Sequence, residues 1–186
     1  MSNADRLALR IAALAPSKPD RLTHLKLQKL VFYAYGACLA FNEEKEVGAD
    51  ITFEAWEHGP VCRPIWASYR QFGSNPLPPF SVKGQPYSPS VEEVLAEVVD
   101  VYGLLSAWQL RQESHLEAPW KRAWEAKERR LSNDELRTHF VRKFRSGPVR
   151  LPAYLVNAPS AALDGIPAQD YGSLERLAQV ARSLRS

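Results

Sequence analysis

The chain has few of the features that mark secreted, membrane-spanning or disulfide-stapled proteins. Its 186 residues include only two cysteines, Cys38 and Cys62, which are too few for a disulfide framework or a four-thiolate zinc cage. The longest mainly apolar run, residues 30–41, is too short to span a bilayer. Residues 1–10 lack the apolar core of a secretory signal peptide. These absences predict a cytoplasmic protein that does not contact a membrane.

Strong charge and the common catalytic signatures are also missing. The formal net charge of +3 is too small to indicate a nucleic-acid binder by itself. The sequence contains no glycine-rich phosphate loop and no Gly-x-Ser-x-Gly turn. Its four histidines are scattered without a His-Glu-x-x-His pattern, so we predict no metal and no cofactor. What the chain does have is 45% apolar residues, enough to bury a core.

Apolar side chains recur at intervals of three and four residues along most of the chain. This spacing predicts a mainly α-helical fold, a compact multi-helix domain. It is clearest over residues 24–41, after Thr23, which we predict to cap a helix. β-branched and aromatic residues predict a short β element near residues 51–56, ahead of a turn at Gly59-Pro60.

Later helix starts and a domain boundary are marked by short local patterns. The Ser-x-x-Glu or Ser-x-x-Gln spacing of a capping box occurs in the pairs Ser90 with Glu93, Ser106 with Gln109, and Ser114 with Glu117. Pro119 predicts that a new helix starts close to it. Gly147 and Pro148 predict a boundary between a domain over residues 1–147 and a C-terminal extension over 148–186, with a final helix from about Ser173.

One candidate for chemistry is Cys62 with either His58 or His115. His58 lies four residues before Cys62 in the sequence His-Gly-Pro-Val-Cys. A thiol hydrolase needs an exposed thiolate and an oriented histidine. We favour the alternative, in which Cys38 and Cys62 are small buried apolar groups. The sequence therefore predicts no enzymatic activity, with a thiol hydrolase as the weaker hypothesis.

A basic segment covers residues 137–150, and no acidic residue occurs between positions 136 and 163. The candidate nucleic-acid contacts within it are Arg137, Arg142, Lys143 and Arg145. A basic helix end that faces solvent explains the same charges and is favoured, and an acidic protein partner would also use them. A DNA-binding transcriptional regulator is therefore the alternative function.

The sequence SHLEAPWKRAW, residues 114–124, sets a histidine beside a glutamate and two tryptophans. His115 and Glu117 would diverge by about 200° on a helix, which argues against a shared metal site. Trp120 and Trp124 would lie on one helical face as core or interface area. We predict a structural corner in which a buried His115 donates a ring hydrogen bond.

Three segments together resemble the Panacea domain, the antitoxin domain of SocA-like proteins, also described in phage-associated proteins. They are LKLQKLVFYAYG (25–36), FEAWEHGPV (53–61) and LSAWQLRQESHLEAPWKRAW (105–124). The resemblance spans about residues 5–146 and marks Gln28, Lys29, Tyr33, Glu54, Trp56, Gly59, Pro60, His115, Pro119 and Trp120. With His58 these are the candidates for partner binding or for holding the fold. We expect the polar and aromatic ones among them to form one polar–aromatic corner.

The resemblance implies a largely helical fold without an established catalytic centre, and a role as the antitoxin of a toxin–antitoxin system. Such antitoxins neutralise a cognate protein toxin encoded nearby by binding it directly. SocA-like members instead act as proteolytic adaptors that deliver the toxin to the ClpXP protease. Two positions depart from the family's pattern: Ser114 stands where threonine is usual, and Tyr35 where glutamine is frequent.

Overall fold

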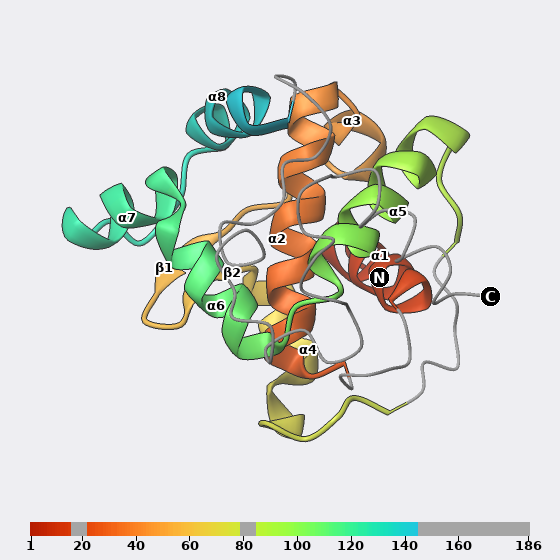
Figure 1. Ribbon diagram of the computed structural model, residues 1–186, viewed down its shortest axis with the longest axis horizontal. Helices are drawn as coiled ribbons and strands as arrows, with labels where there is room; N and C mark the ends of the chain where they lie inside the picture. The colour runs from red at the N-terminus through yellow and green to blue at the C-terminus, as the bar shows by residue number, and fades with distance from the viewer. Residues whose placement is uncertain (16–21, 79–84, 145–186) are drawn as a thin grey trace, which may run out of the picture.

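A computed structural model of the chain describes residues 1–15, 22–78 and 85–144. Within these ranges the helices are α1 (Asn3–Leu14), α2 (His24–Phe41), α3 (Glu44–Val47), α4 (Arg63–Tyr69), α5 (Pro89–Tyr102), α6 (Ala107–Leu116), α7 (Ala118–Glu125), α8 (Asn133–Phe144) and the short 3₁₀ helix η1 (Arg70–Phe72) (Figure 1). Two strands, β1 (Glu54–Trp56) and β2 (Gly59–Val61), form an antiparallel hairpin. The predicted mainly α-helical class and the short β element are confirmed. The predicted C-terminal extension, residues 148–186, lies outside the described residues.

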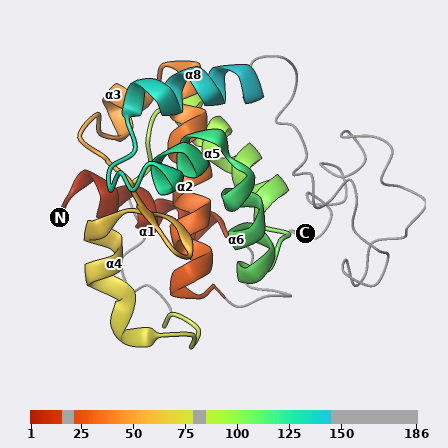
Figure 2. The same cartoon turned by 90° about the vertical axis from the view of Figure 1, so that its left-hand side faces the viewer.

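Helix α2 runs through the middle of the molecule, and α1, α5, α6 and α8 pack around it (Figures 1 and 2). Thr23 caps its start as predicted, because the Thr23 hydroxyl accepts a hydrogen bond from the Lys26 amide at 3.3 Å. Every side chain from Lys26 to Ala40 is buried. The apolar stripe in the sequence therefore understates the burial of this helix, whose polar residues also face neighbouring elements.

Gly36 sets how closely α8 crosses α2. A Cβ atom at Gly36 would lie 2.3 Å from the Phe140 ring, so only glycine allows the ring to sit on the helix backbone. Arg137 of α8 donates a hydrogen bond to the Leu39 carbonyl at 2.9 Å and forms an ion pair with Glu44 at 2.7 Å. These contacts satisfy a carbonyl in the last turn of α2, which has no partner inside the helix.

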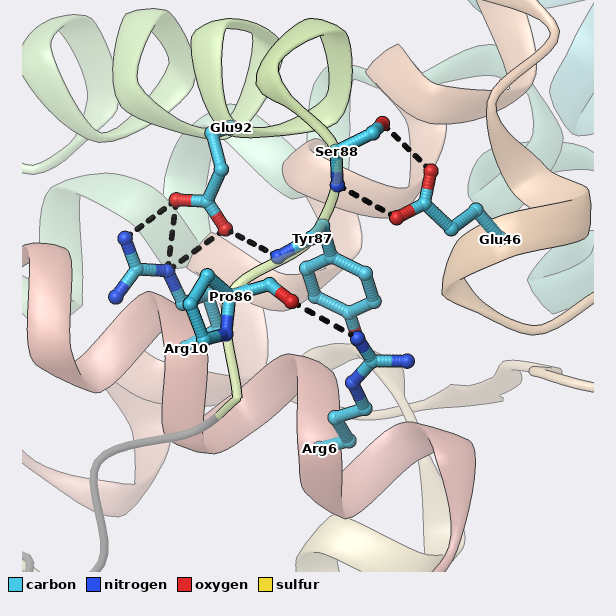
Figure 3. Close-up of polar contacts among 7 residues, drawn as sticks. All are labelled: Arg6, Arg10, Glu46, Pro86, Tyr87, Ser88 and Glu92. Carbon is cyan, nitrogen blue, oxygen red and sulfur yellow. Dashed lines mark hydrogen bonds and ion pairs between the residues drawn. The ribbon is translucent and has the colours of Figure 1, made fainter.

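The segment before α5 is fastened to α1 and α3 by carboxylates (Figure 3). Glu92 accepts a hydrogen bond from the Tyr87 amide at 2.8 Å and forms an ion pair with Arg10 of α1. Glu46 of α3 accepts hydrogen bonds from both the amide and the hydroxyl of Ser88, each at 2.6 Å. Three helices are therefore joined through one short stretch of chain.

The predicted helix starts have mixed outcomes. The capping box of Ser106 with Gln109 is confirmed, with both of its hydrogen bonds formed at 2.7 and 3.2 Å. The start near Pro119 is also confirmed, because α7 begins at Ala118 with Pro119 in its first turn. The Ser90 box is wrong, because α5 begins one residue earlier, at Pro89.

Candidate functional site

The turn of the β-hairpin lies two residues earlier in the chain than the sequence predicts. Trp56 pairs with Gly59 in the hairpin, so the turn consists of Glu57 and His58, both exposed. Gly59 and Pro60 were predicted to form the turn but begin β2 instead. Gly59 has a φ of +91°, which lets the chain leave the turn in a direction that other residues rarely adopt.

Two polar side chains of α2 hold the buried strand β2. The Gln28 amide group donates to the Cys62 carbonyl at 3.1 Å and accepts from the Cys62 amide at 2.9 Å. The Gln28 side chain therefore makes the pair of hydrogen bonds that the backbone of a neighbouring strand would otherwise make with Cys62. The Lys29 Nζ donates to the Pro60 carbonyl at 2.8 Å. Because both side chains are buried, these hydrogen bonds offset part of the cost of removing them from water.

Lys29 is the most unusual charged group of this region, because it is fully buried. Burial, and then the charge of Arg111, lower the pKa of Lys29 to about 7. A Cβ atom at Gly59 would lie 2.9 Å from the Lys29 Nζ and 2.5 Å from the Ser114 hydroxyl oxygen. Gly59 therefore provides both the backbone conformation and the space for the lysine, whose neutral form is well populated near pH 7.

A stack of three rings links α6 to α7. The His115 ring lies parallel to the Trp120 ring at a centroid distance of 4.1 Å, and Trp120 stacks in turn on Trp124 at 5.6 Å. The Trp120 indole N–H donates to the Trp56 carbonyl at 3.1 Å. His115 is hydrogen-bonded to the backbone of Glu57, but its ring is half-buried and not buried as predicted. The stack thus attaches both helices to the hairpin.

The charge state of His115 follows from its surroundings. Burial, and then the charges of Arg111 and Lys29, lower the pKa of His115 to about 4. The imidazole is therefore neutral at physiological pH. Its buried Nε2 atom has no hydrogen-bond partner within the described ranges.

Glu117 faces away from His115 and into a second polar cluster. It accepts hydrogen bonds from His139 and Lys143 of α8, each at 2.5 Å. Burial alone would raise the pKa of Glu117, but these two partners outweigh it and hold the pKa below the usual value. The predicted Ser114–Glu117 capping box is therefore wrong. Tyr33 belongs to this cluster as well, with its ring centroid 5.4 Å from the Lys143 Nζ.

The structure gathers most of the candidate residues, except Tyr33, at the predicted polar–aromatic corner. Those buried are Gln28, Lys29, Gly59, Pro60, Pro119 and Trp120, whereas Glu54, Trp56 and His115 are half-buried. Glu54 accepts hydrogen bonds from the Trp56 indole at 2.8 Å and from Arg129 at 3.0 Å. His58 is exposed. Whether any of these residues contacts a partner stays a prediction.

Arg111 is a member of this region that the sequence reasoning missed. Its Nε donates to the His58 Nδ1 at 3.3 Å, and its guanidinium carbon lies 4.6 Å from the centroid of the Trp108 ring. The signal was present in the sequence, because Trp108, Arg111 and His115 recur at helical spacing along one face of α6.

Two cations of the basic segment, both in its described part on α8, are engaged inside the protein. Arg137 pairs with Glu44, and Lys143 pairs with the buried Glu117. Arg142 is exposed, and Arg145 lies outside the described residues. Two of these cations thus stabilise the position of α8, which reduces the charge available to nucleic acid.

The cysteines lack the surroundings of a reactive thiol. Both are free and buried, which confirms the favoured prediction. Burial raises the pKa of the Cys62 thiol to about 12, so the nucleophilic thiolate is strongly disfavoured. The ring of His58 accepts a hydrogen bond from Arg111, and the ring of His115 stacks on Trp120.

The described ranges contain neither a candidate metal site nor a membrane-spanning helix. No three His, Cys, Asp or Glu side chains are placed there to hold a metal ion. No helix among the same residues is long and apolar enough to cross a bilayer.

One surface pocket, between α7 and α8, is lined by Pro119, Arg122 and His139 among others. A second is lined by Ala55, Trp124, Lys127, Glu128 and Arg129.

Comparison with known families matches residues 27–121, slightly more than half of the chain, to the antitoxin SocA-like Panacea domain. The chain belongs to the SocA-like Panacea family. The match contains the residues of the polar–aromatic corner, from Gln28 to Trp120. No curated protein and no solved structure matches the chain.

In this Panacea chain the family range ends before α8 begins. Helix α8 nevertheless covers α2 through Phe140 and supplies both partners of Glu117. Helix α8, which lies outside the matched residues, therefore covers part of the core that those residues form.

Proposed function

We propose that this Panacea-family chain is a cytoplasmic antitoxin that neutralises a protein toxin encoded nearby by binding it directly. The observation that carries the proposal is the family match over the polar–aromatic corner. Membership of an antitoxin family supports a toxin as the class of partner. The engaged and buried state of Cys62 supports binding over thiol chemistry as the mode of action.

The burial of the family-motif residues divides their proposed roles. Gln28, Lys29 and Trp120 are buried and bind backbone atoms of the hairpin, so we assign them to holding the fold. His58 is exposed in the hairpin turn and is assigned to the toxin contact. A substitution of a buried member is expected to lower stability first and to weaken binding only through unfolding.

The test uses the neighbouring open reading frame, expressed alone and together with this chain. Direct neutralisation predicts growth arrest from the neighbour alone, rescue on co-expression and a stable complex after purification. Rescue in which the neighbour disappears, and only in cells that contain ClpXP, would instead establish the proteolytic adaptor route. Growth arrest that the chain fails to relieve would contradict the antitoxin function for that pair.

DNA binding is less well supported, because Arg137 and Lys143 are held in internal ion pairs. A DNA-binding regulator would lose affinity steeply as salt rises, since phosphate contacts release counterions. Measuring the affinity for the promoter of the operon at two salt concentrations separates this alternative from protein binding.

A further inference from the structure

A row of rings and one guanidinium crosses α6, the hairpin turn and α7. We call it the aromatic row, and its members are Trp108, Arg111, His58, His115, Trp120 and Trp124. Arg111 joins Trp108 to His58, and the three-ring stack continues from His115 to Trp124. His58 and Arg111 both lie close enough to His115 to lower its pKa. Figure 1 shows α6, the hairpin and α7 together on one side of the molecule.

The two ends of the aromatic row face solvent. Trp108 is 58% exposed and Trp124 is 45% exposed, and Leu116 between them on the chain is 57% exposed. Among the described residues only Met1 and Phe41 are other large apolar side chains with comparable exposure. Exposed tryptophans accompanied by arginine are typical of the residues that dominate binding energy at protein interfaces.

Basic side chains accompany each exposed tryptophan. Arg111 lies over the Trp108 ring, while Lys127 and Arg129 line the pocket beside Trp124. The acid in that pocket, Glu128, is paired with Arg122 at 2.9 Å. Lys127 makes no ion pair within the described ranges. Arg129 is itself paired with Glu54 at 3.0 Å, so the cations beside the row that make no ion pair within the described ranges are Arg111 and Lys127.

The aromatic row is also held in place before any partner arrives. Trp124 is stacked on Trp120, whose indole N–H is bonded to the hairpin. Arg111 donates to the Glu57 carbonyl at 3.5 Å as well as to His58. Side chains fixed in this way lose little conformational entropy on binding, which favours affinity.

We propose that the aromatic row is the toxin-binding surface, and that its occupant is an acidic segment of the toxin with an apolar or aromatic anchor. The identity of the partner as a toxin rests on the proposed function above. The acidic character follows from charge complementarity with Arg111 and Lys127, the two cations beside the row without an ion pair in the described ranges. A second copy of this chain would bring the same positive charges to the interface and be repelled.

Nucleic acid fits the aromatic row less well than an acidic peptide. Both faces of the Trp120 ring are covered, by His115 and Trp124, so a base cannot stack there. One face of Trp108 is covered by Arg111.

The first experiment does not need the toxin. The full chain is used to select from a phage-displayed library of random twelve-residue peptides. Selected peptides are expected to be rich in Asp and Glu around one apolar residue, and to bind Trp108→Ala and Lys127→Glu at least tenfold more weakly. The matched controls, Phe41→Ala and Lys45→Glu, alter an exposed apolar and an exposed basic residue away from the row and should bind normally. Neutral or basic peptides, or equal binding by all four variants, would overturn the proposal.

The second experiment repeats the toxin rescue with the same four variants, after circular dichroism shows that each is folded. Loss of rescue by Trp108→Ala and Lys127→Glu alone supports the proposal. Full rescue by all four variants would refute the surface and leave the antitoxin function intact. If the wild type rescues from no toxin, the function fails, and the peptide experiment still decides the chemistry of the surface.

Two further measurements would detect the alternative occupants of the aromatic row, a second copy of the chain or nucleic acid. A dimer in light scattering that Trp108→Ala dissociates would replace the toxin segment by a second copy. Binding of a single-stranded oligonucleotide that Trp108→Ala abolishes, without acidic peptides from the library, would replace it by nucleic acid. Either result overturns the proposal.

Discussion

The replacement of Lys29 by methionine tests whether a buried amine titrates inside the fold. Methionine has a similar length and no charge, so Lys29→Met removes the titration while filling most of the same space. In the wild type the pKa of Lys29 is about 7 in the folded protein, against the ordinary value of 10.5. The unfolded chain therefore binds more protons between these two values, and stability rises with pH across that range.

The size of the effect follows from these two pKa values. Linkage gives the folded wild type about 2 kcal/mol of additional stability between pH 6 and pH 8.5 from Lys29. Lys29→Met should lack this increment, whatever its absolute stability. His115 contributes a smaller rise, because its pKa is about 4 in the folded state. Burial and then Arg111 are the larger causes of that shift and Lys29 a lesser one, so most of this background cancels in the comparison.

Urea unfolding followed by tryptophan fluorescence at pH 6, 7 and 8.5 measures the increment. The curve of unfolding free energy against pH should be steeper for the wild type than for Lys29→Met. Readings stay at or below pH 8.5 because burial raises the pKa of both cysteine thiols, which lowers stability as pH approaches 9 and above. Parallel curves for the two proteins would refute the reasoning and show that Lys29 keeps an ordinary pKa.

Three other substitutions probe the same region. Gly59→Ala should lower the unfolding free energy by about 2–4 kcal/mol, through strain and contact with the lysine. At Gly73, where φ is +54° and space is open, alanine meets backbone strain alone and should cost about 1–3 kcal/mol; a loss at Gly59 no larger than at Gly73 on thermal melting would dismiss the contact. Glu117→Gln leaves the Lys143 ammonium without its counter-charge and should cost about 2–4 kcal/mol in urea unfolding, an estimate contradicted by an unchanged midpoint. The wild type should lose stability as pH falls from about 6.5 toward 4, because His115 must become charged on unfolding; a His115→Gln protein that loses as much would assign the loss to other groups.

The sequence predicts the helices well because their signals are local. The cap at Thr23 and the break at Pro119 depend on side chains within one turn, and both are found in the structure. Glu117 is a residue for which local signals give the wrong partner. Local spacing assigns it to a capping box with Ser114, whereas it is bound by His139 and Lys143, more than twenty residues later on α8.

The sequence identified which residues belong to the candidate site but did not predict how they contact one another. Resemblance to a known family marked Lys29 and Gly59, yet nothing in the spacing indicates that the lysine amine occupies the space that a side chain at 59 would need. Likewise the sequence suggests that the basic segment forms one positively charged patch. In the structure Arg137 and Lys143 instead pair with acidic residues of two different elements. Such pairings depend on how helices distant in sequence cross, which periodicity does not encode.

The hydrogen bonds by which α2 holds β2 and the residue after it all reach main-chain atoms of that segment. Gln28 and Lys29 recognise the amide and carbonyl of Cys62 and the carbonyl of Pro60, groups that almost any residue at those positions would supply. Outward-pointing residues of the hairpin can therefore be exchanged without loosening its anchorage, as binding loops are exchanged on an antibody framework. The same buried core could then carry hairpins with different exposed residues, each set complementary to a different partner.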